Sequence, residues 1–308
     1  MNRKPPLALI AGPTASGKSS LALALAQRTG GVIVNADSAQ LYRDLAVLSA
    51  SPDASEKALV EHRLYGIRDG AKPCSAAEWA EMARSEIADA QAATRLPILV
   101  GGTGLYLRCL LEGIAPVPPI DAKVRASVRS RPVEENWAEL ERLDPQASAS
   151  LNRADSARIA RALEVALSTG RTLGHWQGRR EGGIGDRVEL RPVILLPARQ
   201  WLYDRCDLRF EAMLEAGAIE EVKALLDRKL DPSLPVMRAI GVAEIAAWLA
   251  GETSREEMIA RGRQATRNYA KRQYTWFAHQ PPKGWPRFTE PLGPSTIEQA
   301  LALLDPKA

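Results

Sequence analysis

The sequence has few cysteines and no long hydrophobic segment. Its 308 residues include three cysteines, Cys74, Cys109 and Cys206, which lie far apart and form no CxxC pair. This spacing argues against a disulfide framework and against a structural zinc site, and it favours a reducing compartment. The first apolar run is too short for a signal peptide, and no stretch approaches the roughly 20 apolar residues of a membrane span. We therefore expect a cytoplasmic protein that is neither exported nor embedded in a membrane.

A large excess of one charge is also missing. The 41 lysines and arginines and the 37 acidic residues give a formal net charge of +4 at pH 7. Arginine provides 31 of these cations, and its planar guanidinium suits bidentate contacts to phosphate. So small a total does not establish a nucleic-acid partner, because a general preference for arginine over lysine produces the same composition. The positions of the cations must decide between the two explanations.

Short apolar runs alternate with helical segments in the first hundred residues. Residues 7–11, 32–34 and 97–102 have the pattern of buried strands, and residues 19–28 and 76–93 have that of helices. Alternation of strand, helix and strand predicts an α/β fold with a parallel sheet and right-handed crossovers.

A proline-rich segment at residues 114–120 interrupts this alternation. From residue 121 to about residue 180 the periodicity is helical, and residues 191–197 then resemble a strand that returns to the sheet. We predict a small helical domain inserted into the α/β core. Its expected bounds are residues 121–186, and the core comprises residues 1–120 and 187–308.

The segment after Trp201 is mostly helical in its pattern. We expect three helical segments there, separated at Asp231-Pro232 and at Gly251. A tail with little regular structure follows them.

The strongest motif is GPTASGKS, which lies directly between the first expected strand and the first expected helix. It matches GxxxxGK[ST], whose small residues let successive backbone N–H groups point at an anion while the helix N-terminus adds its positive dipole. Lys18 supplies a point charge and Ser19 a hydroxyl for Mg²⁺. The sequence therefore predicts a P-loop NTPase-like core whose phosphate site consists of Gly12, Pro13, Thr14, Ala15, Ser16, Gly17, Lys18 and Ser19.

Asp37 is the candidate acidic group at the same edge of the sheet. A nucleoside triphosphatase normally has a further strand that ends in a metal-binding aspartate, but residues 97–102 lead to Thr103 without an acid. Asp37 follows the strand at residues 32–34, where α/β sheets bind ligands, so it can accept a proton or hold a metal ion. Equally, an aspartate before a serine often forms a turn or a helix cap, and Thr103 can cap a helix that starts at Gly104.

Five motifs together resemble the tRNA dimethylallyltransferases, also called tRNA isopentenyltransferases. They are GPTASGKS at 12–19, DSAQLY at 37–42, PILVGGTGLYLR at 97–108, RIARALEV at 158–165 and TRNYAKRQYTWF at 266–277. They occur in the family's order and span nearly the whole chain, and the last is the most specific. The resemblance implies transfer of a dimethylallyl group from dimethylallyl diphosphate to N6 of the adenine just 3′ of the anticodon. The implied partners are the tRNA anticodon stem-loop and dimethylallyl diphosphate, and the implied cofactor is Mg²⁺.

The resemblance also implies roles for particular residues around the adenine. Asp37 matches the family's general base for the adenine amine, and Thr103 matches the threonine that contacts the substrate beside it. The segment that surrounds the target adenine comprises Ser38, Ala39 and Gln40.

Further matched residues would stabilise the departing diphosphate. These are Lys18, Ser19 with Mg²⁺, and Arg205 or Arg209. As the C1–O bond breaks, negative charge grows on a leaving group that preplaced cations can hold. Alternatively, either arginine is only a solvated residue on a helix face.

Two segments depart from the family's pattern. The run that usually follows DSMQVY is replaced by residues 43–52, and the usual GYxE appears as Gly241-Val-Ala-Glu244. The C-terminal zinc finger of eukaryotic relatives is absent, as in bacterial-type members.

The last helical segment is a candidate RNA-binding surface. Between Met258 and Thr289 there are seven cations and no acidic residue, and three of the cations recur every four residues, which places them on one helix face. These three are Arg263, Arg267 and Lys271. Contact with tRNA phosphates is the functional interpretation, and a solvated helix with core aromatics is the alternative, which we favour for Trp276 and Phe277.

The inserted segment has cations that also share helix faces. We expect tRNA contact from Arg125, which pairs in spacing with Arg129, and from Arg158 and Arg161. We expect a monomer.

Two other functions compete with the transferase hypothesis. A P-loop kinase for a nucleotide or small molecule would use the same phosphate site, Asp37 and a helical lid. A non-catalytic P-loop protein that regulates RNA would need only the basic stripe, as we call the helix face with Arg263, Arg267 and Lys271.

Overall fold

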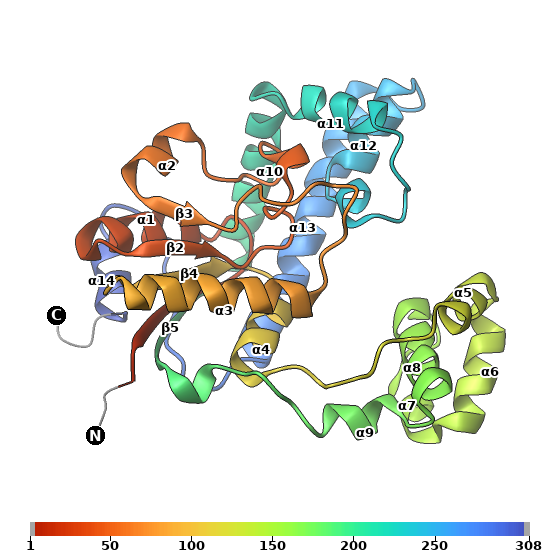
Figure 1. Cartoon of the computed structure of the whole chain (residues 1–308). Coiled ribbons are helices and arrows are strands. Elements are labelled where there is room, and N and C mark those ends of the chain that lie inside the picture. The colour runs from red at the N-terminus through yellow and green to blue at the C-terminus, as the bar shows by residue number, and fades with distance from the viewer. Residues whose placement is uncertain (1–3, 305–308) are drawn as a thin grey trace. The chain divides into compact units, whose positions relative to one another are not determined.

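The chain folds into two compact units in the computed structural model, which describes residues 4–304 (Figure 1). The first unit contains the residues up to 110 and those from 185 onward, and the second contains residues 111–184. We describe each unit by itself.

A six-stranded sheet forms the centre of the first unit. Its strand order is β3-β2-β4-β1-β5-β6, and every neighbouring pair is parallel. The strands are β1 Pro6–Ala11, β2 Val32–Asn35, β3 Glu61–Arg63, β4 Pro97–Gly101, β5 Glu189–Leu195 and β6 Arg287–Phe288. The prediction of an α/β fold with a parallel sheet is confirmed.

The two edge strands were not predicted from the sequence. β3 has three residues, Glu-His-Arg, and β6 has two, so neither contains enough apolar residues to show a strand period. Short and charged edge strands are common because they discourage pairing with another chain.

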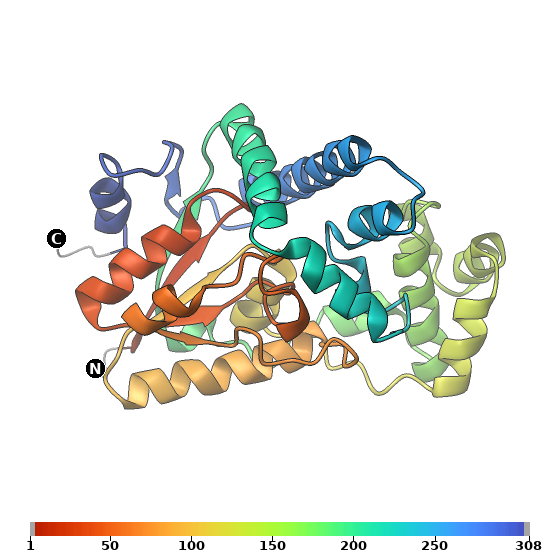
Figure 2. The ribbon, with the colours of Figure 1, turned by 90° about the horizontal axis from the view of Figure 1, so that it is seen from above.

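Helices cover both faces of this sheet. The helices of the first unit are α1 Lys18–Thr29, α2 Ala54–Leu59, α3 Ala76–Ala92, α4 Gly104–Glu112, α10 Arg199–Glu215, α11 Ala218–Asp227, α12 Val242–Leu249, α13 Arg255–His279 and α14 Ile297–Ala302, with 3-10 turns η1 Arg43–Leu45, η2 Gly185–Arg187 and η3 Pro235–Arg238. The boundary between the units falls within α4. Figure 2 shows α1 and α3 on opposite faces of the sheet, as right-handed crossovers in opposite directions require. Buried Leu21 and Leu25 of α1 pack on Ile10, Ile33 and Ile98 of the sheet.

The prediction of three helical segments between Trp201 and the tail was wrong, because four helices, α10 to α13, occupy this region. Gly217 has a φ of 104°, a left-handed conformation that separates α10 from α11. A single glycine between two helical patterns is a weak signal for such a break. The expected tail contains β6 and α14.

The second unit consists of five helices packed around a small core of its own. They are α5 Ala122–Ser130, α6 Val133–Leu143, α7 Pro145–Ser150, α8 Ser156–Thr169 and α9 Leu173–Gln177. Val128, Leu140, Ile159 and Leu163 are fully buried between them. Among the helices of residues 4–304, none is both long and apolar enough to cross a bilayer.

Candidate active site

Three loops meet at the carboxyl edge of the sheet, because β1, β2 and β4 are adjacent and parallel. Ala11 is in register with Gly101, and Asn35 with Val100, so the chain leaves these strands at the same level. The loop after β1 is the GPTASGKS segment. Asp37 and Thr103 lie in the loops after β2 and β4.

The loop after β1 forms a cradle for an anion. Gly17 has a φ of 95°, and a Cβ atom there would lie 2.9 Å from Leu292, so only glycine fits. Ser16 is buried, and its Oγ has no hydrogen-bond partner among the described residues. Ser19 is exposed in the first turn of α1. A buried hydroxyl without a partner beside a helix N-terminus is suited to an anionic ligand.

Lys18 is the cation at the centre of this cradle. Its ammonium donates a hydrogen bond to the Pro13 carbonyl at 2.6 Å. Burial lowers the pKa of Lys18 from 10.5 to about 8, although the negative charge of Asp37 acts in the opposite direction. The cradle therefore holds a cation that a bound anion would stabilise.

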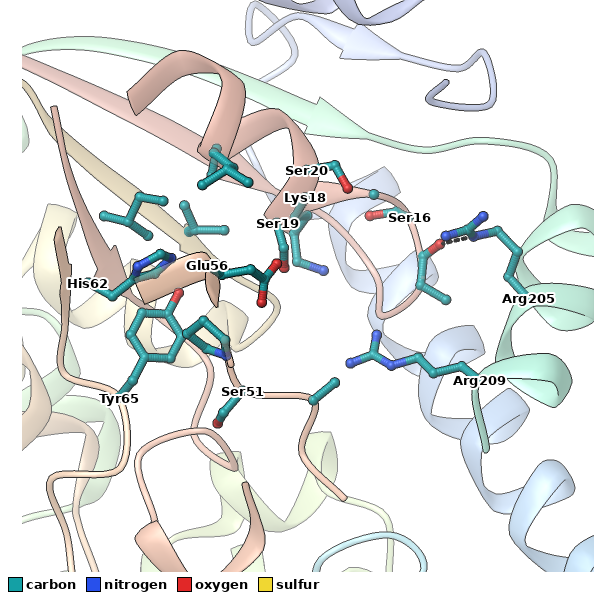
Figure 3. A pocket seen from close by; sticks show the side chains of 18 of the residues that line it. Ser16, Lys18, Ser19, Ser20, Ser51, Glu56, His62, Tyr65, Arg205 and Arg209 are labelled. Carbon is teal, nitrogen blue, oxygen red and sulfur yellow. Dashed lines mark hydrogen bonds between the residues drawn. The ribbon is translucent and has the colours of Figure 1, made fainter. Parts of the chain in front are cut away.

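Two arginines of α10 reach the cradle from the opposite side (Figure 3). Nε of Arg205 donates to the Ala15 carbonyl at 3.0 Å, and the guanidinium lies 4.8 Å from the ring centroid of Trp201. Nη1 of Arg209 donates to Oγ1 of Thr14 at 3.2 Å. Burial lowers the pKa of Arg209, and the Asp37 carboxylate opposes this effect. Both arginines therefore lie against the phosphate loop and add positive charge to it.

A cavity of about 500 Å³ adjoins the cradle. Its polar wall includes Lys18, Ser19 and both arginines of α10, and Figure 3 shows Glu56, His62 and Tyr65 on the facing side. Its apolar wall includes Ile33, Pro52 and Val100. The cavity is thus lined by cations, by further polar groups and by apolar side chains.

Asp37 is held by a buried asparagine. Oδ1 of Asn35 accepts the Asp37 N–H at 2.7 Å, and Nδ2 of Asn35 donates to the carbonyls of Asp37 and Leu64, both at 3.0 Å. The Asp37 carboxylate accepts the Ala39 N–H at 3.0 Å, which makes the turn that the sequence allowed as an alternative. Residues 36–42 form turns and no helix, so Asp37 is not a helix cap.

Thr103 is bonded to the Asp37 loop. Its Oγ1 accepts the Ser38 N–H at 3.0 Å and donates to the Ser38 hydroxyl at 3.3 Å. Its backbone N–H donates to the Ala36 carbonyl at 3.2 Å. The loops after β2 and β4 are therefore joined beside the candidate base.

A second cavity, of about 310 Å³, contains Asp37. Ser38, Ala39, Tyr106 and Tyr269 also line it, and Arg209 and the loop after β1 border both cavities. Burial raises the pKa of Tyr269, and the nearby charge of Asp37 adds to this shift. The Asp37 carboxylate and the phosphate cradle thus both lie near the Arg209 guanidinium.

Gln40 does not line the cavity that contains Asp37, Ser38 and Ala39, and its side chain is bonded to the following loop. Its amide donates to the carbonyls of Ser49 at 3.1 Å and Ala50 at 2.7 Å. The Glu221 carboxylate accepts the N–H groups of Val47 and Leu48 at 2.8 and 3.0 Å. These contacts fix the loop in which the sequence departs from the family pattern.

Two members of the basic stripe on α13 are paired with acidic residues of α10. Arg263 forms an ion pair with Glu211, and Nη1 of Arg267 lies 2.7 Å from Oδ2 of Asp207. Lys271, the third member, is exposed. The stripe is therefore divided into two arginines that hold α13 against α10 and one lysine that faces solvent.

In the second unit, three arginines gather near a buried glutamate. Nε of Arg129 lies 2.7 Å from the fully buried Glu164 carboxylate. Burial lowers the pKa of Arg161, Glu164 raises it, and Arg125 and Arg129 lower it further. Arg158 has an exposed side chain and pairs with Asp155 at 3.3 Å. Most of this positive charge is therefore not neutralised by the single glutamate.

Two buried amides of this site were not predicted from the sequence. Asn35 precedes the DSAQLY motif, and Gln273 lies inside TRNYAKRQYTWF without having been given a role. The available signal for Asn35 was a polar residue between the apolar residues Val34 and Ala36. Gln273 lies between Arg272 and Tyr274, so its neighbours gave no such signal.

Comparisons with known proteins agree with the motifs. Residues 40–280 match the family model described as IPP transferase. The tRNA dimethylallyltransferase of Erythrobacter litoralis is 65% identical over 92% of this chain and 91% of its own length. That of Sphingopyxis alaskensis is 60% identical over 95% of this chain and 96% of its own length.

Solved structures with the same fold were also found. The tRNA isopentenylpyrophosphate transferase of Bacillus halodurans has a TM-score of 0.70 at 30% identity, covering 99% of this chain and 98% of its own. A eukaryotic dimethylallyltransferase, described as acting on tRNA, has a TM-score of 0.78 at 27% identity over 88% of this chain and 69% of its own.

Proposed function

The chain belongs to the IPP transferase family, and we propose that it transfers a dimethylallyl group from dimethylallyl diphosphate to N6 of the adenine just 3′ of the tRNA anticodon. One observation carries the proposal. Arg209 borders both the cavity at the phosphate cradle and the cavity that contains Asp37. A diphosphate in the first cavity and an adenine amine in the second would lie on opposite sides of the carbon that is transferred.

The chemistry follows from this arrangement. The N6 lone pair attacks C1 of the donor, the C1–O bond breaks, and the diphosphate leaves with the bonding electrons. Asp37 accepts the proton that N6 loses, with Thr103 beside it. The backbone N–H groups of residues 12–19, with Lys18, Arg205 and Arg209, stabilise the charge that grows on the diphosphate.

We propose Mg²⁺ as the cofactor, bound with the diphosphate. Residues 4–304 contain no group of three or more His, Cys, Asp or Glu side chains that could hold a metal ion. Mg²⁺ keeps several waters and binds largely through substrate phosphates, so it needs few protein ligands. The exposed hydroxyl of Ser19 in the first turn of α1 is its protein ligand in this proposal, and the ion supplies further neutralising charge.

The decisive assay incubates the purified protein with Mg²⁺, labelled dimethylallyl diphosphate and unmodified tRNA. We expect label at N6 of the adenine 3′ of the anticodon. Absence of label together with rapid ATP hydrolysis would instead support the P-loop kinase. The names of the relatives favour the transferase over both that kinase and a non-catalytic regulator.

The adenine must leave the anticodon loop to reach Asp37. Extruding a loop base costs a few kcal/mol, less than for a paired base. We propose that phosphate contacts offset this cost, made by Lys271 of the first unit and by Arg125, Arg158 and Arg161 of the inserted helical domain, residues 121–186. We propose that the protein acts as a monomer in the cytoplasm.

Replacing Lys271 and Arg267 should have different effects on tRNA binding. Lys271 is exposed, so Lys271→Ala should reduce the slope of log K against log salt by about one unit, because one phosphate contact is lost. Arg267 is paired with Asp207, so Arg267→Ala should leave the slope unchanged and lower the free energy of unfolding by about 1 kcal/mol. Filter binding at several salt concentrations and urea unfolding measure the two effects. A lower slope for Arg267→Ala would show that tRNA displaces the ion pair.

A further inference from the structure

Gln273 of α13 joins two of the three loops at the carboxyl edge of the sheet. The side chain is buried, with 6% of its surface exposed. Its Oε1 accepts the Thr14 N–H at 2.8 Å, and its Nε2 donates to the Gly102 carbonyl at 2.9 Å. One amide therefore bridges the phosphate loop after β1 and the loop after β4.

The backbone at Gly102 leaves room for this amide. A Cβ atom at position 102 would lie 2.3 Å from Nε2 of Gln273. One turn further along α13, the Trp276 ring covers Gly104, where a Cβ atom would lie 2.4 Å from the ring. The GGTG segment, residues 101–104, is therefore fitted closely to one face of α13. From that face, Gln273 makes polar contacts with both loops.

From Gly102 a short series of hydrogen bonds leads to the candidate base. Thr103 follows Gly102 directly, and its backbone N–H donates to the Ala36 carbonyl. Its hydroxyl accepts the Ser38 N–H, and Asp37 lies between Ala36 and Ser38. A shift of Gly102 would therefore move the Asp37 loop relative to the phosphate loop.

We propose that Gln273 is a positioning residue that sets the distance between the phosphate loop and the Thr103–Asp37 segment. This inference rests on the proposed transfer reaction. In a displacement at C1, the amine and the departing diphosphate must lie on opposite sides of the carbon, and a misplacement of about 1 Å costs on the order of 100-fold in rate. Binding of either substrate alone depends much less on this distance.

The chemistry of the bridge requires an amide. Thr14 offers a donor and Gly102 an acceptor, so the bridging group must accept at one atom and donate at another. A glutamate side chain has the same shape, but its carboxylate can only accept, and it would repel the Gly102 carbonyl. Protonation restores a donor, so Gln273→Glu should regain the bridge at low pH.

The test measures single-turnover transfer and substrate binding for Gln273→Glu and Gln273→Met. We expect a transfer rate about 10- to 100-fold below that of the wild type at pH 8, with dissociation constants for tRNA and diphosphate within about threefold. For Gln273→Glu, the rate relative to the wild type should rise as the pH falls from 8 to 6. The matched control is Gln264→Glu, an exposed glutamine of the same helix, whose relative rate should stay near one at every pH.

Three results would overturn the inference. The first is a rate within threefold of the wild type for both variants. The second is a Gln273→Glu ratio that does not change with pH, since this isostere leaves packing intact and a merely structural role predicts no recovery. The third is a loss seen only as weaker diphosphate binding. Failure of the wild-type protein to transfer the label would overturn the proposed function as well, whereas normal transfer by the variants would overturn the role of Gln273 alone.

Discussion

Asp37→Asn should lower the single-turnover rate of transfer about 1000-fold. An asparagine Oδ1 can still accept the Ala39 N–H, so the turn that Asp37 makes is retained. The amide cannot accept the proton of N6 at neutral pH, and general-base catalysis contributes about 10²- to 10⁴-fold. The rate of the chemical step is measured in a single-turnover experiment, in which labelled donor reacts with excess enzyme and tRNA and samples are quenched at successive times.

Asp231→Asn provides a matched control for this variant. Asp231 accepts the N–H of the residue two positions later, Ser233, at 2.8 Å, which is the same turn contact as that of Asp37. The Asp231→Asn variant should therefore transfer the dimethylallyl group at the wild-type rate. The affinity of Asp37→Asn for tRNA should stay within about threefold of the wild type, because the change removes a proton acceptor and leaves the loop in place. If Asp37→Asn instead transfers at more than a third of the wild-type rate, the carboxylate is a turn former only.

Binding of diphosphate should weaken as the pH rises above about 8. In the free protein, burial lowers the pKa of Lys18 to about 8, so the ammonium loses its proton above that pH. A bound diphosphate raises this pKa again, and binding at higher pH must therefore take up a proton. Between pH 8 and 10 the dissociation constant should rise about tenfold per pH unit, whereas below pH 8 Lys18 is charged in both states and contributes no pH dependence.

Calorimetric titration with inorganic diphosphate in EDTA measures this effect without a metal ion. Lys18→Met should bind diphosphate about 100-fold more weakly at pH 7, because it lacks the central charge of the cradle, and its affinity should not fall further above pH 8. Lys223→Met, at an exposed position of α11, should behave as the wild type. An equally steep decline in Lys18→Met would assign the pH dependence to another group.

The lowered pKa of Lys18 also changes how the free energy of unfolding depends on pH. The pKa of Lys18 is lower in the folded protein than its ordinary value of 10.5, so the unfolded chain binds more protons between pH 8 and 10.5. This group therefore makes the free protein more stable as the pH rises through that interval, and less stable below it. The cradle is thus organised for a bound anion at some cost to the free state.

The sheet and its ligand edge could be predicted because they depend on local patterns. Apolar runs of strand length marked β1, β2 and β4, and the intervening helices required them to be parallel. Parallel strands place their carboxyl ends together, which brought Asp37 and Thr103 to the edge of the phosphate loop. The short charged strand β3 and the break at Gly217 gave weaker signals in the sequence and were not predicted.

The contacts of the basic stripe could not be predicted in the same way. Helical spacing puts Arg263 and Arg267 on one face, but the spacing is the same whether that face meets solvent or another helix. Their acidic partners Glu211 and Asp207 lie on α10, more than 50 residues earlier in the chain. Charge pattern along one helix contains no information about a partner of that kind.

The sequence by itself determined the phosphate loop, the parallel order of helix and strand, and the family to which the motifs belong. The tertiary structure alone decided how these parts are held. Asn35 is hydrogen-bonded to the backbone of Asp37, Arg209 borders two cavities, and Gln273 bridges Thr14 and Gly102. Thr14 and Gly102 are 259 and 171 residues away from Gln273 in the sequence. Backbone conformation and hydrophobic period are properties of neighbouring residues, whereas the partner of a buried polar group is chosen by which segments the completed fold brings within about 3 Å.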